Sequence, residues 1–332
     1  MVRKAARANR SGECMQYRGA ILDDYIDVAR QVADWSQLPE VEFQTFTRPL
    51  GDTQNVIEAL NGVAVLCLMR ERTPISRKVI EALPDLKIIT SGGMRNAAID
   101  IAAANERGIL VCGTESIGYT PGELTVGLML ELSRRIGYED RQMKDGVRWQ
   151  TTAGTGMLGR TLGIIGLGKV GSHVARIARA MEMNVIAWSR NLTAERCQQL
   201  GVTLTTKEEL LKQSDFATLH VQLSPRTEGL ISAVDLALMK PTAYLINTSR
   251  GQCVDEGALI SALQNKQIGG AGIDVFNEEP LPFNHPFRKL NNVVATPHLG
   301  YATLDNYKVF YTGMVANIRA WLDGKPINQM KP

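Results

Sequence analysis

Short apolar runs alternate with amphipathic segments along the chain from Tyr17 onward. Runs that are apolar throughout are typical of strands buried on both faces, and the segments between them show helical spacing. The first series contains expected strands at residues 19–25, 41–46, 63–69, 86–90 and 109–112. Expected helices occupy residues 27–35, 76–83 and 100–106, and a further helix includes residues 56–60. This alternation predicts a parallel sheet covered by helices on both faces.

A second series of the same kind begins at Thr161. Its expected strands are residues 161–165, 184–188, 216–220, 244–247, 270–275 and 293–296, and its expected helices are residues 170–181, 207–212, 233–239 and 256–265. A long helix from Thr120 to about Lys144 is expected between the two series, because Pro and Gly in its first turn suit a helix start. An amphipathic helix at residues 303–322 follows the second series. The pattern predicts the α/β class with two doubly wound parallel sheets.

Length and charge agree with two soluble domains. The chain has 332 residues, 37 basic and 34 acidic, so its net charge of +3 gives no field that favours nucleic acid or a membrane surface. Its longest apolar stretches, such as residues 63–69, are far shorter than the ~18 residues of a spanning helix. Residues 1–16 are basic and lack the apolar core of a secretory signal. A targeting peptide or a nucleic-acid arm stays open there, but we expect a disordered extension.

The five cysteines are Cys14, Cys67, Cys112, Cys197 and Cys253. No pair has the C-x-x-C spacing, so neither a zinc site nor a disulfide framework is expected, and we expect no bound metal. Cys67 and Cys112 lie in strand-like apolar runs, where a reduced cysteine acts as a small hydrophobic residue. We therefore expect a reducing compartment, most simply the cytoplasm.

The strongest local motif is Gly166-Leu-Gly-Lys-Val-Gly171. An expected strand precedes it and an expected helix follows, which is the context that gives a GxGxxG motif its meaning. Gly166 would allow the tight turn, Gly168 would let the backbone approach a diphosphate, and Gly171 would let the helix pack on the strand. The helix start, with Lys169 and Val170, would supply N–H donors and a positive dipole. The motif predicts a dinucleotide cofactor.

The next expected strand ends at Ser189-Arg190, where many such domains carry an acid that binds the adenosine ribose. Serine leaves room for a 2′-phosphate, and Arg190 could pair with it, so we expect NAD(P) with a leaning toward NADP(H). The alternative is that Arg190 is a solvated loop residue. A comparison of kcat/KM with the two cofactors separates these interpretations.

Three charged residues follow expected strands of the second series. Arg250 follows residues 244–247, Glu279 follows 270–275, and His298 follows 293–296. Ligands of open α/β sheets bind at the carboxyl ends of the strands, so the three side chains are candidates for one site. Imidazole suits proton transfer near neutral pH, a carboxylate would orient it, and a guanidinium would hold a substrate carboxylate and keto oxygen. The set suits hydride transfer to or from a small 2-keto or 2-hydroxy acid.

These motifs together resemble the D-isomer-specific 2-hydroxyacid dehydrogenase family, which includes phosphoglycerate dehydrogenases and glyoxylate/hydroxypyruvate reductases. The segments that carry the resemblance are residues 166–171, His220, Asn247-Thr-Ser-Arg-Gly251, Asp274-Val-Phe-Asn-Glu-Glu-Pro280 and Thr296-Pro-His-Leu-Gly300. The resemblance implies a Rossmann NAD(P)-binding domain at residues 119–299, inserted into a flavodoxin-like substrate domain at residues 17–118 and 300–332. It also implies a homodimer and an active site in the interdomain cleft.

Individual roles carry over by position. The resemblance implies that Arg250, Glu279 and His298 are catalytic, that Asp274 lies near the nicotinamide carboxamide, and that Thr248 and His220 lie at the cofactor. In the first series it implies substrate contacts from Arg70 and from the backbone amides of Gly92 and Gly93. The loop at residues 93–100 is longer than the common family form, which bears on those substrate contacts.

The substrate is not specified by the sequence. Arg70 and Arg72 would suit a phosphate, whereas glyoxylate and hydroxypyruvate fit the same chemistry without one. At this length, a phosphoglycerate dehydrogenase is expected to lack a C-terminal regulatory domain. The alternative function is a catalytically idle, dinucleotide-sensing corepressor on the same scaffold, and assays of 2-keto acids with NADPH and NADH distinguish the two.

Overall fold

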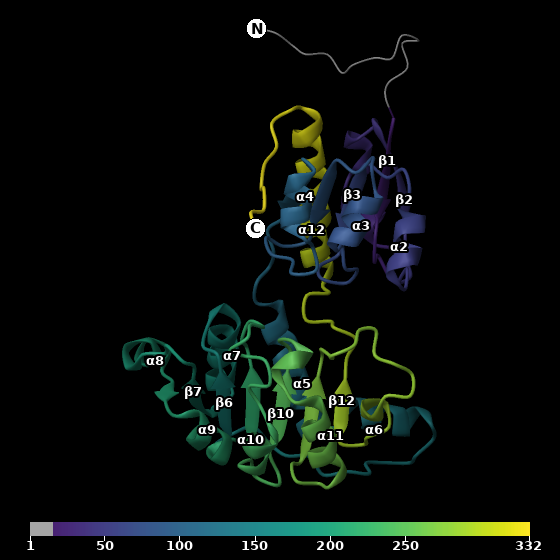
Figure 1. Cartoon of the computed structure of the whole chain (residues 1–332). Coiled ribbons are helices and arrows are strands. Elements are labelled where there is room, and N and C mark those ends of the chain that lie inside the picture. The colour runs from purple at the N-terminus through teal and green to yellow at the C-terminus, as the bar shows by residue number, and fades with distance from the viewer. Residues whose placement is uncertain (1–15) are drawn as a thin grey trace, which may run out of the picture. The chain divides into compact units, whose positions relative to one another are not determined.

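The chain divides into two compact units, each built on one parallel sheet (Figure 1). The computed structural model describes residues 16–332, so the expectation for the basic extension, Cys14 included, falls outside the described residues. The first unit comprises the described residues up to Ile117 together with Thr303–Pro332, and the second comprises Gly118–Ala302. The predicted fold class, two parallel-sheet α/β domains, is confirmed.

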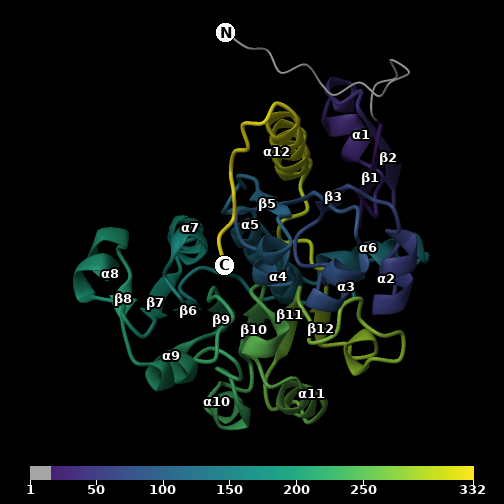
Figure 2. The ribbon, with the colours of Figure 1, turned by 45° about the horizontal axis from the view of Figure 1, so that its top comes forward.

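The first unit has a five-stranded sheet in the order β2-β1-β3-β4-β5. Its strands are β1 (Tyr17–Ile21), β2 (Val41–Thr45), β3 (Val65–Leu68), β4 (Ile88–Ser91) and β5 (Leu110–Gly113). Its helices are α1 (Ala29–Val32), η1 (Trp35–Gln37), α2 (Thr53–Ala59), α3 (Arg77–Ala82), α4 (Ile101–Glu106) and α12 (Leu304–Leu322). Figure 2 shows α1 and α12 on one face of this sheet and α2, α3 and α4 on the other. The central strands β3 and β4 are buried throughout because helices cover both faces.

The second unit has a seven-stranded sheet in the order β12-β11-β10-β9-β6-β7-β8. Its strands are β6 (Thr161–Ile165), β7 (Asn184–Trp188), β8 (Thr203–Leu204), β9 (Phe216–Leu219), β10 (Tyr244–Asn247), β11 (Gly270–Ile273) and β12 (Val293–Ala295). Its helices are α5 (Thr120–Arg134), α6 (Ile136–Lys144), α7 (Lys169–Ala180), α8 (Ala194–Leu200), α9 (Lys207–Gln213), α10 (Ala233–Ala237), η2 (Gly251–Cys253), α11 (Glu256–Gln264) and η3 (Pro286–Arg288). Figure 2 shows α5 and α7 on one face and α9, α10 and α11 on the other.

The chain order reverses in this second sheet between β6 and β9. From β6 the sheet continues through β7 to β8, and the chain then returns to place β9 on the other side of β6. Such a reversal leaves a crevice at the carboxyl ends of the strands, where open α/β sheets bind their ligands. A ligand site in this unit is therefore expected at the carboxyl ends of β6 and β9.

The sequence predicted one long helix at residues 120–144, and this is wrong because two helices, α5 and α6, occupy the segment. Arg135 takes a left-handed conformation, with φ of 52°, and separates α5 from α6. The Glu131 carboxylate oxygens accept the N–H of Gly137 at 3.1 and 2.9 Å. This N–H lies in the first turn of α6, where backbone donors have no partner within the helix. The sequence interpretation also missed α8 and β8, which form a short crossover after β7.

The expected helix at residues 27–35 is also shorter than predicted. Only α1, of four residues, is regular, and η1 follows it. The Asp24 carboxylate accepts the N–H groups of Val28 and Ala29, whereas the Asp34 carboxylate accepts the N–H of Ser36 and starts η1. Side-chain oxygens that bind nearby backbone N–H groups favour such a break over a continuous helix.

Candidate active site

The glycine loop follows β6 and opens α7 at the crevice of the second sheet. Gly166 has φ of +100°, a conformation that favours glycine, and an added Cβ there would lie 2.5 Å from the His220 carbonyl oxygen. A Cβ on Gly171 would lie 2.1 Å from the Gly166 carbonyl oxygen. A Cβ on Gly168, by contrast, would meet nothing within 4 Å. Two glycines are therefore required by the protein itself, whereas Gly168 borders open space.

The first turn of α7 adds electrostatic character to that space. Gly168 is the N-cap, Lys169 and Val170 begin the helix, and the first turn contains no acidic residue. The first N–H groups of a helix have no partner within it, and its dipole favours a negative group there. The open cradle at Gly168 and these donors fit a diphosphate.

The turn after β7 places Ser189 and Arg190 beside this loop in the sheet order. Ser189 is half-buried and Arg190 is exposed. The Ser189 carbonyl oxygen accepts the N–H of Leu192 at 3.1 Å, which shapes the turn. The turn presents a hydroxyl and a guanidinium and no carboxylate from residues 189–193.

His220 follows β9 on the other side of the crevice. Its N–H donates to the Ile165 carbonyl at 2.8 Å, so the backbone is tied to the end of β6. The Nε2 atom is enclosed and has no hydrogen-bond partner among the described residues. Burial lowers the pKa of His220 to about 4, so the ring is neutral at physiological pH. An enclosed ring nitrogen that lacks a partner fits a site completed by a ligand.

Glu279 and His298 meet at the carboxyl ends of β11 and β12. Nδ1 of His298 lies 2.6 Å from Oε2 of Glu279, and Oε1 of Glu279 accepts the N–H of Phe276 at 3.0 Å. A carboxylate only accepts, so Nδ1 carries the hydrogen and Nε2 is left for another partner. Both side chains keep access to solvent, at 21% for His298 and 25% for Glu279.

The backbone around His298 is held by one buried carboxylate. Asp274 is fully buried and accepts the Thr296 hydroxyl at 2.6 Å, the Leu299 N–H at 2.7 Å and the Gly300 N–H at 2.9 Å. Burial raises the pKa of Asp274, although these hydrogen bonds lower it. His298 itself has φ of 55°, a left-handed conformation that costs free energy unless its surroundings enforce it. Asp274 stabilises this conformation because it binds Thr296, which precedes His298, and Leu299 and Gly300, which follow it.

Arg250 projects from the turn after β10. Oδ1 of Asn247 accepts the Ser249 N–H, and the Asn247 side-chain amide donates to the Arg250 carbonyl at 2.9 Å, so the turn is closed on itself. The Ser249 hydroxyl accepts the Val221 N–H and donates to the Leu219 carbonyl, which ties this turn to the end of β9. Thr248 is buried, and its hydroxyl lies 2.9 Å from that of Thr125 on α5.

Arg70, Gly92 and Gly93 lie together in the first unit, after β3 and β4. Arg70 has φ of 56°, and its Nη1 donates to the Gly92 carbonyl at 3.1 Å. The expected role of the two glycine amides needs correction. The Gly92 N–H donates to the Leu68 carbonyl at 3.0 Å, and the Gly93 N–H donates to the Thr114 hydroxyl at 2.9 Å. Both donors are already used, so neither is available to a substrate carboxylate.

Two long-range supports were missed by the sequence interpretation. Thr125 pairs with Thr248 across 123 residues, and no local pattern marks such a partner. Thr296 belongs to the Thr296-Pro-His-Leu-Gly300 segment named from the sequence, but its bond to Asp274 depends on the parallel pairing of β11 with β12. Within residues 16–332, no group of three or more His, Cys, Asp or Glu side chains is placed to hold a metal ion. No helix in the same range is long and apolar enough to cross a membrane.

Comparison with known proteins places this geometry in a family. The family described as D-isomer specific 2-hydroxyacid dehydrogenase, NAD binding domain, matches residues 126–300. The D-3-phosphoglycerate dehydrogenase of Synechocystis sp. is 39% identical over 262 residues, which are 78% of this chain and 47% of that protein. The glyoxylate reductase of Thermococcus litoralis is 38% identical over 260 residues, which are 76% of this chain and 78% of that protein. The chain thus spans about half the length of the curated relatives named D-3-phosphoglycerate dehydrogenase.

Solved structures give the same result. The crystal structure of a putative D-3-phosphoglycerate dehydrogenase from Ralstonia solanacearum superposes with a TM-score of 0.88 at 33% identity, covering 94% of this chain and 96% of that one. The apo-structure of D-lactate dehydrogenase from Escherichia coli superposes with a TM-score of 0.81 at 26% identity, covering 95% of this chain and 100% of that one. The chain belongs to the D-isomer specific 2-hydroxyacid dehydrogenase family.

Proposed function

We propose that this protein is an NAD(P)-dependent oxidoreductase that interconverts a small 2-keto acid and its D-2-hydroxy acid. The observation that carries the proposal is the Glu279–His298 pair, 2.6 Å apart, at the same sheet edge as the glycine loop. An oriented imidazole beside a dinucleotide cradle is the equipment that such a reaction needs.

The cofactor would be held by residues around the crevice of the second sheet. Gly166, Gly168 and Gly171, with Lys169 and Val170 at the helix start, would receive the diphosphate. His220, Thr248 and Asp274 would lie along the rest of the site, at the carboxyl ends of β9, β10 and β11. The nicotinamide, when bound, supplies or accepts the hydride at C2 of the substrate.

The protein's own groups handle the proton and the charge. In the direction of reduction, His298 gives its Nε2 proton to the keto oxygen as the C=O π electrons move onto that oxygen, and the ring becomes neutral. Oxidation returns the proton to Nε2. Glu279 keeps the ring oriented through Nδ1 and stabilises its charged form. Arg250 would bind the substrate carboxylate and polarise the keto oxygen, because its guanidinium presents paired N–H donors.

We further propose a leaning toward NADP(H). The support is the turn at Ser189 and Arg190, which offers a small hydroxyl and an exposed guanidinium and no acid. A carboxylate there would repel a 2′-phosphate, whereas Arg190 would pair with it.

The substrate is proposed to be of the phosphoglycerate, hydroxypyruvate or glyoxylate type. Relatives named D-3-phosphoglycerate dehydrogenase and glyoxylate reductase support this range. Arg70, which is held by the Gly92 carbonyl, is proposed to assist the binding of the anionic substrate.

A homodimer formed through the second unit and a cytoplasmic location complete the proposal. Large apolar side chains are exposed on α6 and the segment after it, namely Ile136 at 56%, Met143 at 56%, Trp149 at 70% and Leu158 at 72%. Exposed apolar side chains of this size support an interface in this part of the unit. Cys67, Cys112, Cys197 and Cys253 are free thiols in the structure, which suits a reducing compartment. Light scattering of wild type and Trp149→Glu tests the interface: we expect a dimer that the substitution weakens, and a wild-type monomer would contradict it.

A panel assay tests the function. Wild-type protein is mixed with glyoxylate, hydroxypyruvate or phosphohydroxypyruvate and with NADPH or NADH, and absorbance of the reduced nicotinamide is followed. We expect turnover of at least one acid, with a D-2-hydroxy product on chiral chromatography. Tight dinucleotide binding without turnover of any 2-keto acid would favour the corepressor-like alternative.

A further inference from the structure

A single carboxylate outside the proposed catalytic set contacts both ends of the loop that carries Glu279. We call residues 276–287 the Glu279 loop. Near its start, the Asn277 N–H donates to Oε2 of Glu256 at 3.4 Å. Near its end, Nε2 of His285 lies 3.3 Å from Oε1 of the same Glu256. Glu279 lies between these two contacts.

The direction of the His285 contact follows from its other ring nitrogen. Nδ1 of His285 accepts the N–H of Phe287 at 3.3 Å, so Nε2 carries the hydrogen and donates to Glu256. The His285 side chain is 14% exposed and that of Glu256 is 23% exposed, so water competes weakly for this bond. The ring of Phe287 packs 4.9 Å from that of His285 and 6.3 Å from that of Phe276. The far end of the loop is thus fixed by polar and aromatic contacts together.

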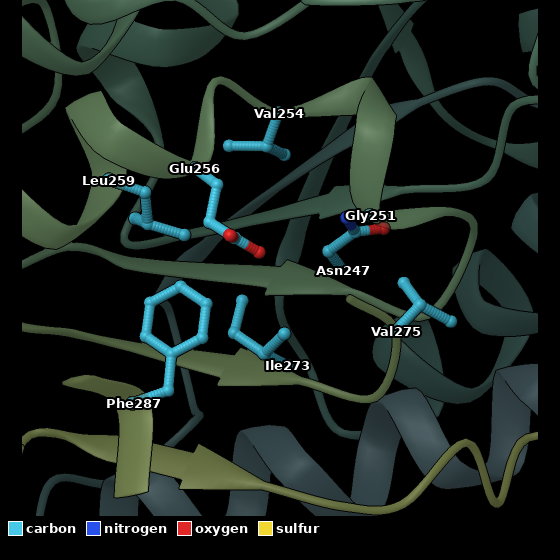
Figure 3. Close-up of a pocket in the computed structure, with 8 residues that line it drawn as sticks. All are labelled: Asn247, Gly251, Val254, Glu256, Leu259, Ile273, Val275 and Phe287. Atoms are coloured by element: carbon cyan, nitrogen blue, oxygen red, sulfur yellow. The ribbon is translucent and has the colours of Figure 1, made fainter. Parts of the chain in front are cut away.

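The turn that carries Arg250 packs against the same loop. A Cβ on Gly251 would lie 2.2 Å from the carbonyl carbon of Phe276, so only glycine lets the two segments approach this closely. Figure 3 shows the Glu256 side chain extending from the start of α11 into a small pocket that Gly251 also lines, with Phe287 and Ile273 across from it. Glu256 therefore stands where the Arg250 turn, the Glu279 loop and α11 come together.

We propose that Glu256 and His285 are positioning residues that hold Glu279 at hydrogen-bond distance from His298. This proposal rests on the proposed function for its kinetic consequence. Glu279 is two residues from Asn277, so release of the Asn277 N–H and of His285 would let its carboxylate move away from Nδ1. Misplacement of a catalytic group by about 1 Å costs on the order of 10²-fold in rate, so a small loosening is sufficient.

The kinetic test compares four variants with wild type. Glu256→Ala removes both contacts, and we expect kcat to fall by roughly 10- to 100-fold with unchanged dinucleotide Kd. Glu256→Gln keeps the shape and one acceptor oxygen, so its loss should be smaller. His285→Gln keeps a nitrogen donor at similar reach and should retain more kcat than His285→Ala. The matched control is Glu208→Ala. Glu208 lies in the first turn of α9 and its carboxylate pairs with Lys212, so its removal should leave kcat unchanged.

Two measurements on the cofactor-free protein decide the proposal independently of turnover. Hydrogen exchange should accelerate across residues 276–287 in Glu256→Ala and His285→Ala, and the NMR ring signals of His298 should shift, while Glu208→Ala changes neither. A purely structural role would lower Tm and leave the His298 signals and kcat of the folded enzyme unchanged, and that result would overturn the proposal. Absence of wild-type turnover would reject the proposed function alone, because the exchange and NMR results would still stand. Where Glu256→Ala does not fold, the isosteric Glu256→Gln and His285→Ala give the decision.

Discussion

Oε2 of Glu279 lies 2.6 Å from Nδ1 of His298, and the two residues come from loops that follow neighbouring parallel strands. The ring of His298 is also flanked by Tyr301, with centroids 5.6 Å apart and the planes at 72°. An imidazole held on two sides has one orientation, which leaves Nε2 as its reactive atom. The proposed function explains why this pair is only partly buried, since Nε2 would have to reach a substrate.

Glu279→Gln tests the orienting role of the carboxylate. The amide keeps the size of the side chain but loses the charge that stabilises the protonated ring, so kcat should fall by about 10²-fold. Dinucleotide Kd from fluorescence titration should stay the same, because the cradle at Gly168 is untouched. A kcat equal to that of wild type would remove Glu279 from the catalytic set.

Gly168→Ala and Gly171→Ala should separate cofactor binding from folding. A Cβ at position 168 meets no protein atom within 4 Å, whereas one at position 171 would lie 2.1 Å from the Gly166 carbonyl oxygen. We expect Gly168→Ala to cost less than about 1 kcal/mol of stability, and Gly171→Ala to cost about 1–3 kcal/mol or more. Dinucleotide affinity should fall strongly in Gly168→Ala despite its intact fold. Equal affinities in wild type and Gly168→Ala, with denaturation midpoints as the folding check, would contradict the cradle.

Ser189→Asp and Arg190→Ala test the cofactor preference. An acid at position 189 should repel a 2′-phosphate and bind a ribose hydroxyl, so the ratio of kcat/KM for NADPH to that for NADH should fall sharply. Arg190→Ala should lower kcat/KM for NADPH by roughly 10- to 100-fold, the worth of a charge-assisted bond, and leave NADH nearly unchanged. Arg179→Ala is the control, since Arg179 donates to the Leu200 carbonyl at the far end of α7. A wild-type preference for NADH would show that Arg190 is a solvated loop residue.

His220 should make stability depend on pH. Its pKa is lowered from 6.5 to about 4 by burial, so between these values the unfolded chain binds the proton and the folded one does not. Stability therefore rises with pH through this window and is lost as pH falls from about 6.5 to about 4, by up to ~3 kcal/mol from this residue. Urea unfolding of wild type and His220→Asn across the window measures the difference in slope. Identical slopes would mean that the ring titrates normally in the folded state.

The sequence predicted most where candidate functional residues lie at the ends of regularly spaced apolar runs. Alternating apolar runs predicted both sheets, and the strand ends marked Arg250, Glu279 and His298 as residues of one edge. Contacts between distant segments were not predictable. The break at Arg135 depends on the Glu131 side chain, and the role of Asp274 in holding residues 296–300 depends on strand pairing. The occupied amides of Gly92 and Gly93 likewise depend on Leu68, the last residue of β3, and on Thr114, which directly follows β5.

The central claim is that His298 transfers the substrate proton in a 2-keto acid reductase. Its most direct test is kcat of His298→Ala with the 2-keto acid and cofactor that wild type uses best. We predict a decrease of about 10²- to 10⁴-fold with unchanged dinucleotide Kd and Tm, which is the usual contribution of a general acid or base. A variant that retains near wild-type kcat would contradict the claim.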